Sequence, residues 1–306
     1  MGSMESKPSD DIVLIIAKKR FKTLCSEEVK SFETEALRFG HQVAGHTREV
    51  ILSCNGKILK PMLKEQLFRK EVTFYEEMYQ NGTSCSQTNC AFIPQYFGVY
   101  RSTSDTDYLV LEDMTRFYHF PNIIDLKIGK QTFEPTAPLE KKQRGILKCP
   151  YQEIIGFRIS GYKYFNSLEN RYVIVDKNFG RNLEPQSIKP ALAIFFCNGA
   201  LVRVDVIFVV IQKLQTILRW MKRQTKYHFY CSSLLIIYEG MMSSSLSSSP
   251  SSSPVKFDDV LVKMIDFAHT VNGNGTLDEG YTYGLEKLIY YLSDILYATE
   301  KSINSL

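Results

Sequence analysis

The chain has 306 residues, a formal net charge of +4 and hydrophobic residues at 44% of its positions. This length suits one large domain or two lobes that share a cleft, and so small a net charge does not indicate nucleic-acid binding. No segment contains the ~18 uninterrupted apolar residues that cross a bilayer, so we expect no membrane span.

The first third of the chain predicts hairpins and one helix. Met1-Gly2-Ser3 precede a second methionine and are interpreted as a cloning remnant outside the fold. Apolar and polar residues alternate over residues 41–60 around Asn55-Gly56, which predicts a β-hairpin. Apolar residues at helical spacing predict a helix from Met62 to Tyr79. The runs FIPQYFGVY and YLVLEDM predict a second hairpin.

After Pro121 the pattern becomes mixed α+β. Apolar periodicity predicts helices near 184–197 and 205–226, and a terminal helix with an apolar stripe from Leu285 to Leu296. The runs FYCSSLLIIYEG and VLVKMIDFAH predict the strands of a hairpin. Between them, residues 242–254 are almost all serine and proline, which predicts a disordered insertion because the tract has little apolar surface to bury.

Positive charge is concentrated in one segment. From Lys127 to Lys163 there are eight basic and three acidic residues, a local net charge of +5, so the rest of the chain sums to −1. A positive field confined to one segment suits a compact polyanion held in one place.

The seven cysteines predict reduced thiols. They are scattered, odd in number and without metal-binding spacing, so neither zinc nor a disulfide framework is expected. With no secretory signal in the sequence, we expect a soluble intracellular protein, in the cytoplasm with the nucleus as an alternative. A bridge between Cys85 and Cys90 is therefore the less favoured alternative.

Two segments carry candidate site residues. Asp125 and Lys127 stand two apart in the apolar run PNIIDLKIG, and alternate residues of a strand face the same side. An ion-paired edge strand is the simpler alternative. Asp266 ends the strand in VKMIDFAHT, where nucleotide kinases commonly hold a magnesium ligand, although many other strands end in aspartate.

Together these segments resemble a known family. PNIIDLKIG (a PxxxDxKxG pattern), SSLLIIYEG, MIDFAHT and DEGYTYGLEKL stand in the order and approximate spacing of the inositol polyphosphate kinases. HQVAGH, ILK, KEVTFYEEMY, LEDMT, TFEPTAPLEKKQRG, GFRISGYKYF and DKNFGRNL extend the resemblance over roughly residues 40–298. The resemblance implies an α+β, two-lobed fold distantly similar to protein kinases, with ATP in the interlobe cleft and lobes at 1–112 and 113–306.

The resemblance also implies an ATP site. No glycine motif that cradles phosphates is present, so other groups must hold the nucleotide. Lys60 and Glu71 match the lysine on the ATP phosphates and the glutamate that orients it, with a surface salt bridge as the alternative. Glu112 and Met114 match the hinge whose backbone reads adenine. Asp125 is expected to be catalytic and to contact ATP, either by binding the ribose or by orienting the attacking hydroxyl.

The transferred phosphate and its metal ion are the next implied contacts. Lys127 matches a catalytic lysine between the γ-phosphate and the substrate phosphates, where a fixed positive charge stabilises developing charge. Asp266, with Ser232 or Ser233, matches the Mg²⁺ site and a catalytic role; the serine hydroxyls could equally satisfy a turn.

The basic segment 127–163 is expected to bind the inositol phosphate. The residues implied are Lys127, Lys141, Lys142, Arg144 and Lys163, with Lys148, Arg158 and Lys177 as further members. None of the five histidines is given a role, because phosphoryl transfer through a loose transition state needs no strong base.

The function implied is that of an ATP- and Mg²⁺-dependent, monomeric inositol phosphate kinase. KIGKQTFEPTAPLEKKQRG resembles the multikinases, whereas KYHFYCSSLLIIYEG with the Ser/Pro tract resembles the hexakisphosphate kinases. We expect a hexakisphosphate kinase that makes diphosphoinositol pentakisphosphate and also accepts the trisphosphate. A multikinase acting on tris- and tetrakisphosphates is the alternative. A protein kinase would need an HRDxxxxN loop, and a non-catalytic polyanion-binding module would not need Lys60, Glu71 and Asp266.

Overall fold

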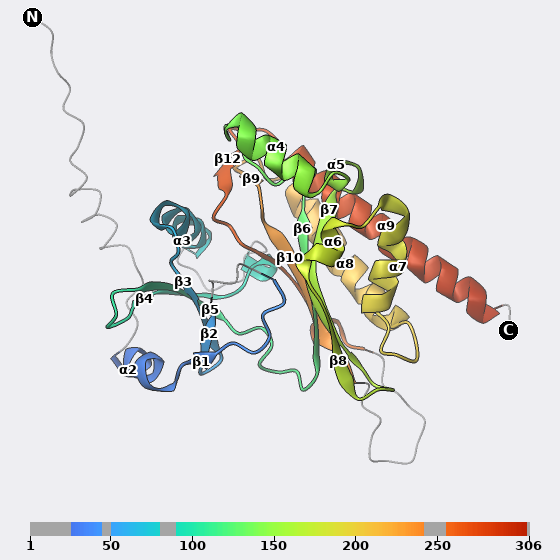
Figure 1. The fold of residues 1–306 in the computed structure, drawn as a ribbon, viewed down its shortest axis with the longest axis horizontal. Helices are drawn as coiled ribbons and strands as arrows, with labels where there is room; N and C mark the ends of the chain where they lie inside the picture. Colours follow the sequence, from blue (N-terminus) through green and yellow to red (C-terminus); the bar gives the residue numbers. More distant parts are fainter. Residues whose placement is uncertain (1–25, 45–49, 80–89, 242–254, 305–306) are drawn as a thin grey trace, which may run out of the picture.

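The computed structural model describes residues 26–44, 50–79, 90–241 and 255–304. These residues form two five-stranded sheets and one two-stranded sheet. Figure 1 shows the first five-stranded sheet on one side of the second, with a group of long helices on the opposite side of the second. The mixed α+β prediction is confirmed, and the expected lobe limits at 1–112 and 113–306 stay a prediction.

The first sheet has the order β1-β2-β3-β5-β4. Its strands are β1 (Leu37–Arg38), β2 (Leu52–Cys54), β3 (Lys57–Pro61), β4 (Tyr96–Arg101) and β5 (Asp107–Glu112). Asn55 and Gly56 both have positive φ, 49° and 71°, as the tight turn of the predicted hairpin requires. Helix α2 (Ser26–Glu35) was not predicted. Helix α3 (Glu65–Tyr79) was predicted, but it begins three residues later than the expected start at Met62.

The second sheet has the order β11-β10-β6-β7-β8. Its strands are β6 (Pro121–Ile128), β7 (Phe157–Asn166), β8 (Arg171–Val175), β10 (Ser233–Glu239) and β11 (Val260–Ile265). Strand β6 is the middle strand, hydrogen-bonded to β10 on one side and β7 on the other. The ion-paired edge strand considered for Asp125 and Lys127 is therefore wrong.

Long helices cover one face of the second sheet (Figure 1). They are α7 (Pro185–Phe195), α8 (Val204–Met221) and α9 (Glu279–Asn304), and the predicted ranges match the first two within a few residues. Leu285, Leu288, Leu292 and Ile295 of α9 are buried, so its predicted apolar stripe is confirmed as core.

The family motif DEGYTYGLEKL fixes where α9 begins. The Asp278 carboxylate accepts hydrogen bonds from the backbone N–H of Phe229 (2.6 Å) and of Tyr281 (2.8 Å), so it joins the helix start to β9 (Tyr227–Phe229). At Gly284, a Cβ atom would lie 2.3 Å from the carbonyl oxygen of Gly156 and 2.9 Å from the amide nitrogen of Gly129. The missing side chain lets α9 approach the ends of β6 and β7 closely.

Two further helices were not predicted. They are α4 (Leu139–Lys148) and α5 (Gln152–Ile155). Short elements complete the fold: α6 (Lys177–Arg181), β12 (Thr270–Asn272), which pairs with β9, and 3-10 turns at Cys90–Phe92 and Phe257–Asp259. In the part of the chain that the structure describes, no helix is long and apolar enough to cross a bilayer.

Several sequence predictions fall outside the described residues. These are the Ser/Pro tract 242–254, residues 1–3 and the residues from 80 to 89, which include Cys85. Four of the cysteines are described as free thiols: Cys54, Cys149, Cys197 and Cys231.

Candidate functional site

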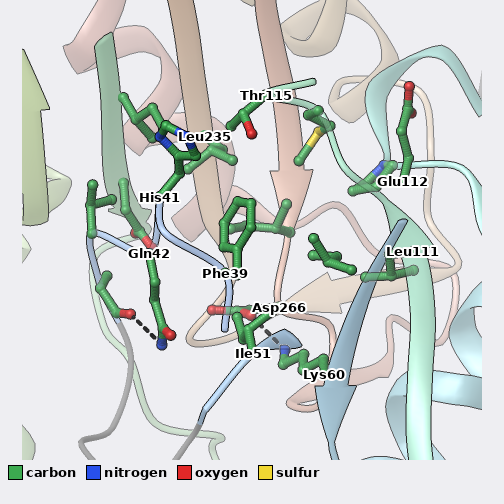
Figure 2. Close-up of a pocket in the computed structure, with 18 of the residues that line it drawn as sticks. Phe39, His41, Gln42, Ile51, Lys60, Leu111, Glu112, Thr115, Leu235 and Asp266 are labelled. Atoms are coloured by element: carbon green, nitrogen blue, oxygen red, sulfur yellow. Dashed lines mark hydrogen bonds and ion pairs between the residues drawn. The ribbon is translucent and has the colours of Figure 1, made fainter. Parts of the chain in front are cut away.

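A cleft of about 830 Å³, including its open mouth, lies between the two five-stranded sheets. Ile58 and Lys60 of β3 line it from the first sheet, and Asp125 of β6 and Leu235 of β10 line it from the second. Figure 2 shows Lys60 and Asp266 reaching toward each other across this cleft.

Lys60 lies at the centre of an ion-pair network. Its Nζ atom is 3.0 Å and 3.1 Å from the two carboxylate oxygens of Glu71, and 2.7 Å from Oδ1 of Asp266. Burial raises the pKa of Glu71, and the charge of Lys60 opposes that rise. The pair is therefore largely desolvated rather than a surface salt bridge, which is the condition under which an anionic ligand interacts strongly with the lysine.

Packing between the sheets positions this network. The ring of Phe74 in α3 stacks on that of Phe267 with centroids 4.0 Å apart, and the Phe267 N–H donates to Glu71 at 3.2 Å. Asp266, directly after β11, has φ = 63°, a left-handed conformation that aspartate tolerates better than most residues. The chain turns sharply at this point, and the carboxylate projects into the cleft.

Asp266 also faces Lys127. The Lys127 Nζ is 4.0 Å from Oδ2 of Asp266 and donates to the carbonyl oxygen of Cys231 at 2.7 Å. Burial opposes ionisation of Asp266, but the charges of Lys60 and Lys127 hold its pKa below the ordinary value. The structure thus brings together the four predicted residues Lys60, Glu71, Lys127 and Asp266.

Asp125 is buried on the same side of β6 as Lys127. Burial raises the pKa of Asp125, and the charge of Lys127 opposes this rise. The hydroxyls of Ser160 and Ser233 are close enough to lower that pKa, but neither they nor Oδ1 of Asp125 has a hydrogen-bond partner of good geometry within the described residues. Asp125 lines the cleft, so its carboxylate can accept a hydrogen bond from a ligand hydroxyl group.

The two serine candidates differ in their surroundings. The Ser232 hydroxyl donates a hydrogen bond to the backbone carbonyl of Asp266 at 2.8 Å. Ser232 therefore bonds the backbone of the turn, which was the alternative to a metal role considered from the sequence. Ser233 is fully buried and lies two residues before the cleft-lining Leu235, so its side chain is on the same face of β10.

A divalent cation fits beside Asp266. The described residues contain no group of three or more His, Cys, Asp or Glu side chains arranged to hold a metal ion. Mg²⁺ in nucleotide sites is usually bound by one or two carboxylates together with substrate phosphates, so a preformed cage is not needed. Asp266, whose side chain is 38% exposed, fits that role, and a metal role for Ser233 stays a prediction.

Much of the rest of the cleft is apolar. Phe39, Ile51, Leu111, Ile237 and Ile265 are among its lining residues, together with the predicted hinge residues Glu112 and Met114. Met114 is buried with Ile123 and Ile237. The Glu112 side chain accepts a hydrogen bond from the Gln95 N–H at 3.3 Å, so a ligand here would meet the backbone of the hinge. Such a slot suits a flat heterocycle.

Residues 39–44 cross the second sheet and form one wall of the cleft (Figure 2). A Cβ atom at Gly161 of β7 would lie 2.2 Å from the carbonyl oxygen of Val43, so only glycine permits this contact. Val43 also packs against the cluster that contains Met114.

Lys163 lies apart from Lys127. It pairs in register with Ile123, four residues before Lys127 on β6, which corresponds to a separation of ~13 Å along the strand. Its Nζ is 2.5 Å from Nδ1 of His41, and burial lowers the pKa of Lys163 to about 8. The sequence prediction expected Lys163 and Lys127 to share one anion site. The structure instead places them apart.

Sequence reasoning missed a polar cluster on the other side of Asp266. Nδ1 of His269 is 2.8 Å from the Glu134 carboxylate, and Nζ of Lys70 is 3.5 Å from it. Burial lowers the pKa of His269, and the nearby charge of Lys141 lowers it further. The signal available was the position of His269 within MIDFAHT, three residues after Asp266.

The remaining basic candidates include neighbours on α4. Because α4 is helical, the side chains of Lys141 and Lys142 leave the helix about 100° apart, and their binding of an inositol phosphate stays a prediction. Lys148 lies at the end of α4, where burial and the charges of three basic neighbours lower its pKa. Those neighbours are Arg181, Arg158 and Lys177.

Comparisons with known proteins agree with this geometry. The sequence model of the family "Inositol polyphosphate kinase" matches residues 108–293. The human inositol polyphosphate multikinase is 34% identical over 211 residues, which is 65% of this chain and 50% of that protein. Mouse inositol hexakisphosphate kinase 3 is 35% identical over 203 residues, 61% of this chain and 50% of that protein. The chain thus spans about half the length of these animal relatives.

Solved structures show the same fold. The crystal structure of the inositol phosphate multikinase Ipk2 from S. cerevisiae, in complex with ADP and Mn²⁺, aligns with a TM-score of 0.62 and 26% identity. The alignment covers 79% of this chain and all of the yeast chain. The fold class expected from the sequence is confirmed.

Proposed function

Because this chain belongs to the inositol polyphosphate kinase family, we propose that it transfers the γ-phosphate of ATP to an inositol phosphate in the cleft between its two sheets. One observation carries the proposal. The carboxylate of Asp266 lies between the ammonium groups of Lys60 and Lys127, at 2.7 Å and 4.0 Å, beside an apolar slot. A nucleotide with a metal-bound triphosphate has matching chemistry along its length.

In this proposal each part of the cleft contacts one part of ATP. Adenine lies in the apolar slot near Met114, and its polar edge meets the hinge backbone. Asp125, which is buried and has no good partner on Oδ1, accepts hydrogen bonds from ribose hydroxyls. Lys60, oriented by Glu71, contacts the phosphates, and Asp266 holds the divalent cation, for which we propose Mg²⁺.

Lys127 has a different part in the transfer step. The divalent cation, when bound, neutralises charge on the phosphates. Lys127, held by the Cys231 carbonyl at 2.7 Å, keeps a positive charge beside the phosphoryl group as it moves. No strong base is required in a loose transition state, so orientation of the attacking hydroxyl is sufficient.

The inositol phosphate would lie on the side of Asp266 that faces α4. His269 is near Asp266 on this side, Lys141 and Lys70 are near His269, and the group around Lys148 continues the positive surface beyond them. These side chains come from α3, α4, α6, β7 and the loop after β11. Lysine ammonium groups act as adaptable point charges and permit more than one orientation of the inositol ring.

For the substrate, we propose the tris- and tetrakisphosphates of a multikinase. The comparisons support this alternative better than the hexakisphosphate activity first expected from the sequence. Arabidopsis inositol polyphosphate multikinase alpha is 28% identical over 291 residues. The match covers 87% of this chain and 98% of that protein. The Ser/Pro tract that favoured the hexakisphosphate kinases lies outside the described residues.

The test is a product assay. The purified chain is incubated with Mg-ATP and a panel of inositol phosphates, and the products are resolved by anion exchange. We expect tetrakis- and pentakisphosphates from less phosphorylated substrates. A diphosphoinositol product would reinstate the hexakisphosphate activity. No transfer to any inositol phosphate would refute the proposed function.

A further inference from the structure

Helix α4 carries its apolar side chains on the outside of the molecule. Leu139 is 69% exposed, Ile146 56% and Leu147 80%. No residue of the helix is buried. In Figure 1 the helix lies at an outer edge of the second lobe, next to α5. A helix of a globular protein normally turns its apolar stripe toward the core, so this orientation requires another explanation.

The exposed apolar residues lie on one side of the helix. With 3.6 residues per turn, positions 139, 146 and 147 fall within an arc of about 100°, which also contains Gln143. The opposite side carries Gly145, where a Cβ atom would lie 2.8 Å from the ring of Phe133. Helix α4 therefore contacts the rest of the protein through a glycine and leaves its apolar face outward.

Basic residues border this apolar face. The helix contains four basic residues and one acidic residue, a net charge of +3 over ten residues. On the helical wheel, Lys142 lies beside Ile146 on one edge, and on the other edge Glu140 lies between Leu147 and Arg144. No ion pair with an acidic side chain engages the four basic residues within the described ranges, so they remain able to contact an anionic surface.

We propose that α4 docks on an anionic lipid bilayer, with Leu139, Ile146 and Leu147 inserted among the headgroups. An apolar stripe bordered by basic residues is the pattern of helices that lie in the plane of a membrane interface. Lys142 and Arg144 then contact the negative surface of the leaflet. An apolar groove on a partner protein would accept these three apolar side chains, but it would offer no negative charge to the basic residues at the border.

Docking through α4 would orient the whole protein. Lys141 on the same helix lies close to His269 at the cleft. The mouth of the cleft would therefore open near the membrane surface, without any segment crossing the bilayer. This inference does not depend on the proposed catalytic activity.

The proposal is tested by vesicle flotation with the full chain. Vesicles of phosphatidylcholine alone are compared with vesicles in which about one lipid in four is phosphatidylserine. Neither lipid carries an inositol phosphate, so the cleft cannot account for binding. We expect binding to the anionic vesicles that weakens as salt rises. The triple variant Leu139→Ser, Ile146→Ser, Leu147→Ser should bind on the order of 100-fold more weakly.

A matched control removes three equally exposed apolar residues elsewhere. Leu168→Ser, Ile174→Ser and Leu201→Ser change side chains that are 71%, 71% and 62% exposed, outside α4. This control should bind vesicles like the unmodified chain. If the triple variant does not fold, the single variant Leu147→Ser, at the most exposed of the three α4 positions, is tested for vesicle binding in its place.

Four results would overturn the proposal. They are no binding of the unmodified chain to anionic vesicles, equal binding by the α4 variants, equal loss in the control, and a dimer in light scattering that the α4 variants abolish. The last result would show that a second copy of the chain covers α4.

Discussion

Replacing Asp266 with asparagine tests the centre of the candidate site. The substitution keeps the shape of the side chain and removes one negative charge. Asparagine also tolerates the left-handed conformation, φ = 63°, that the backbone adopts at this position. The variant should therefore fold as the unmodified chain does.

The expected effects on activity and stability differ greatly in size. Without the carboxylate, the ammonium groups of Lys60 and Lys127 lose the charge between them, and the divalent cation that we propose at this site would lose its protein ligand. Loss of such a charge-stabilising contact lowers kcat on the order of 10²-fold. The free energy of unfolding should change by about 1 kcal/mol or less, because the side chain is 38% exposed and Lys60 keeps Glu71.

Kinetic and unfolding measurements separate these two effects. The rate of γ-phosphate transfer is measured at saturating Mg²⁺ and ATP, and stability by urea unfolding. Asp294→Asn is the matched control, because Asp294 pairs with Lys189 at the same 2.7 Å and is 41% exposed. The control should keep full activity. If Asp266→Asn retains more than about a tenth of the rate, the assignment of Asp266 to the metal is wrong.

Three further predictions test the surroundings of the site. Gly161→Ala places a Cβ atom 2.2 Å from the Val43 carbonyl oxygen and should raise KM for ATP on the order of 10-fold. The control Gly40→Ala, whose Cβ atom would have no neighbour within 4 Å, should leave KM unchanged. Equal KM values in the two variants would contradict the role of the contact between Gly161 and Val43. Lys163 has a pKa of about 8 in the folded chain against an ordinary 10.5, so the unfolded state binds more protons between these values. Relative to Lys163→Met, the stability of the unmodified chain should then rise with pH across this window and stay level below it; a constant difference in urea unfolding would refute this. Asp278→Ala leaves the buried N–H of Phe229 unpaired and should cost about 2 kcal/mol in urea unfolding, and a loss below about 0.5 kcal/mol would show that α9 does not need this cap.

Local pattern was sufficient for much of the fold. The hairpin turn at Asn55-Gly56, strand β6 and the buried stripe of α9 all follow from side chains two to four residues apart. These spacings are fixed by strand and helix geometry, and they can be followed in the sequence without knowing the rest of the molecule. The same spacing did not find α4, because only three of its ten residues are large and apolar and none of its residues is buried.

The sequence also determined which residues were candidates for the chemistry. Motif resemblance pointed to Lys60, Glu71, Lys127 and Asp266, although up to 206 positions separate them along the chain. It did not single out His269 or Lys70, although they lie in the quoted motifs MIDFAHT and KEVTFYEEMY, because no local spacing assigns either side chain a role. Their position beside Glu134 depends on contacts between elements that are distant in sequence.

Only the tertiary structure decided how the candidates meet. Stacking of Phe74 on Phe267 places Glu71 against Lys60, and the backbone turn at Asp266 directs its carboxylate between two lysines. Lys163 was separated from Lys127 by the register of β6 with β7, which a count of basic residues cannot reveal. Short-range spacing is encoded in consecutive side chains, whereas distances across a cleft depend on the packing of the whole core.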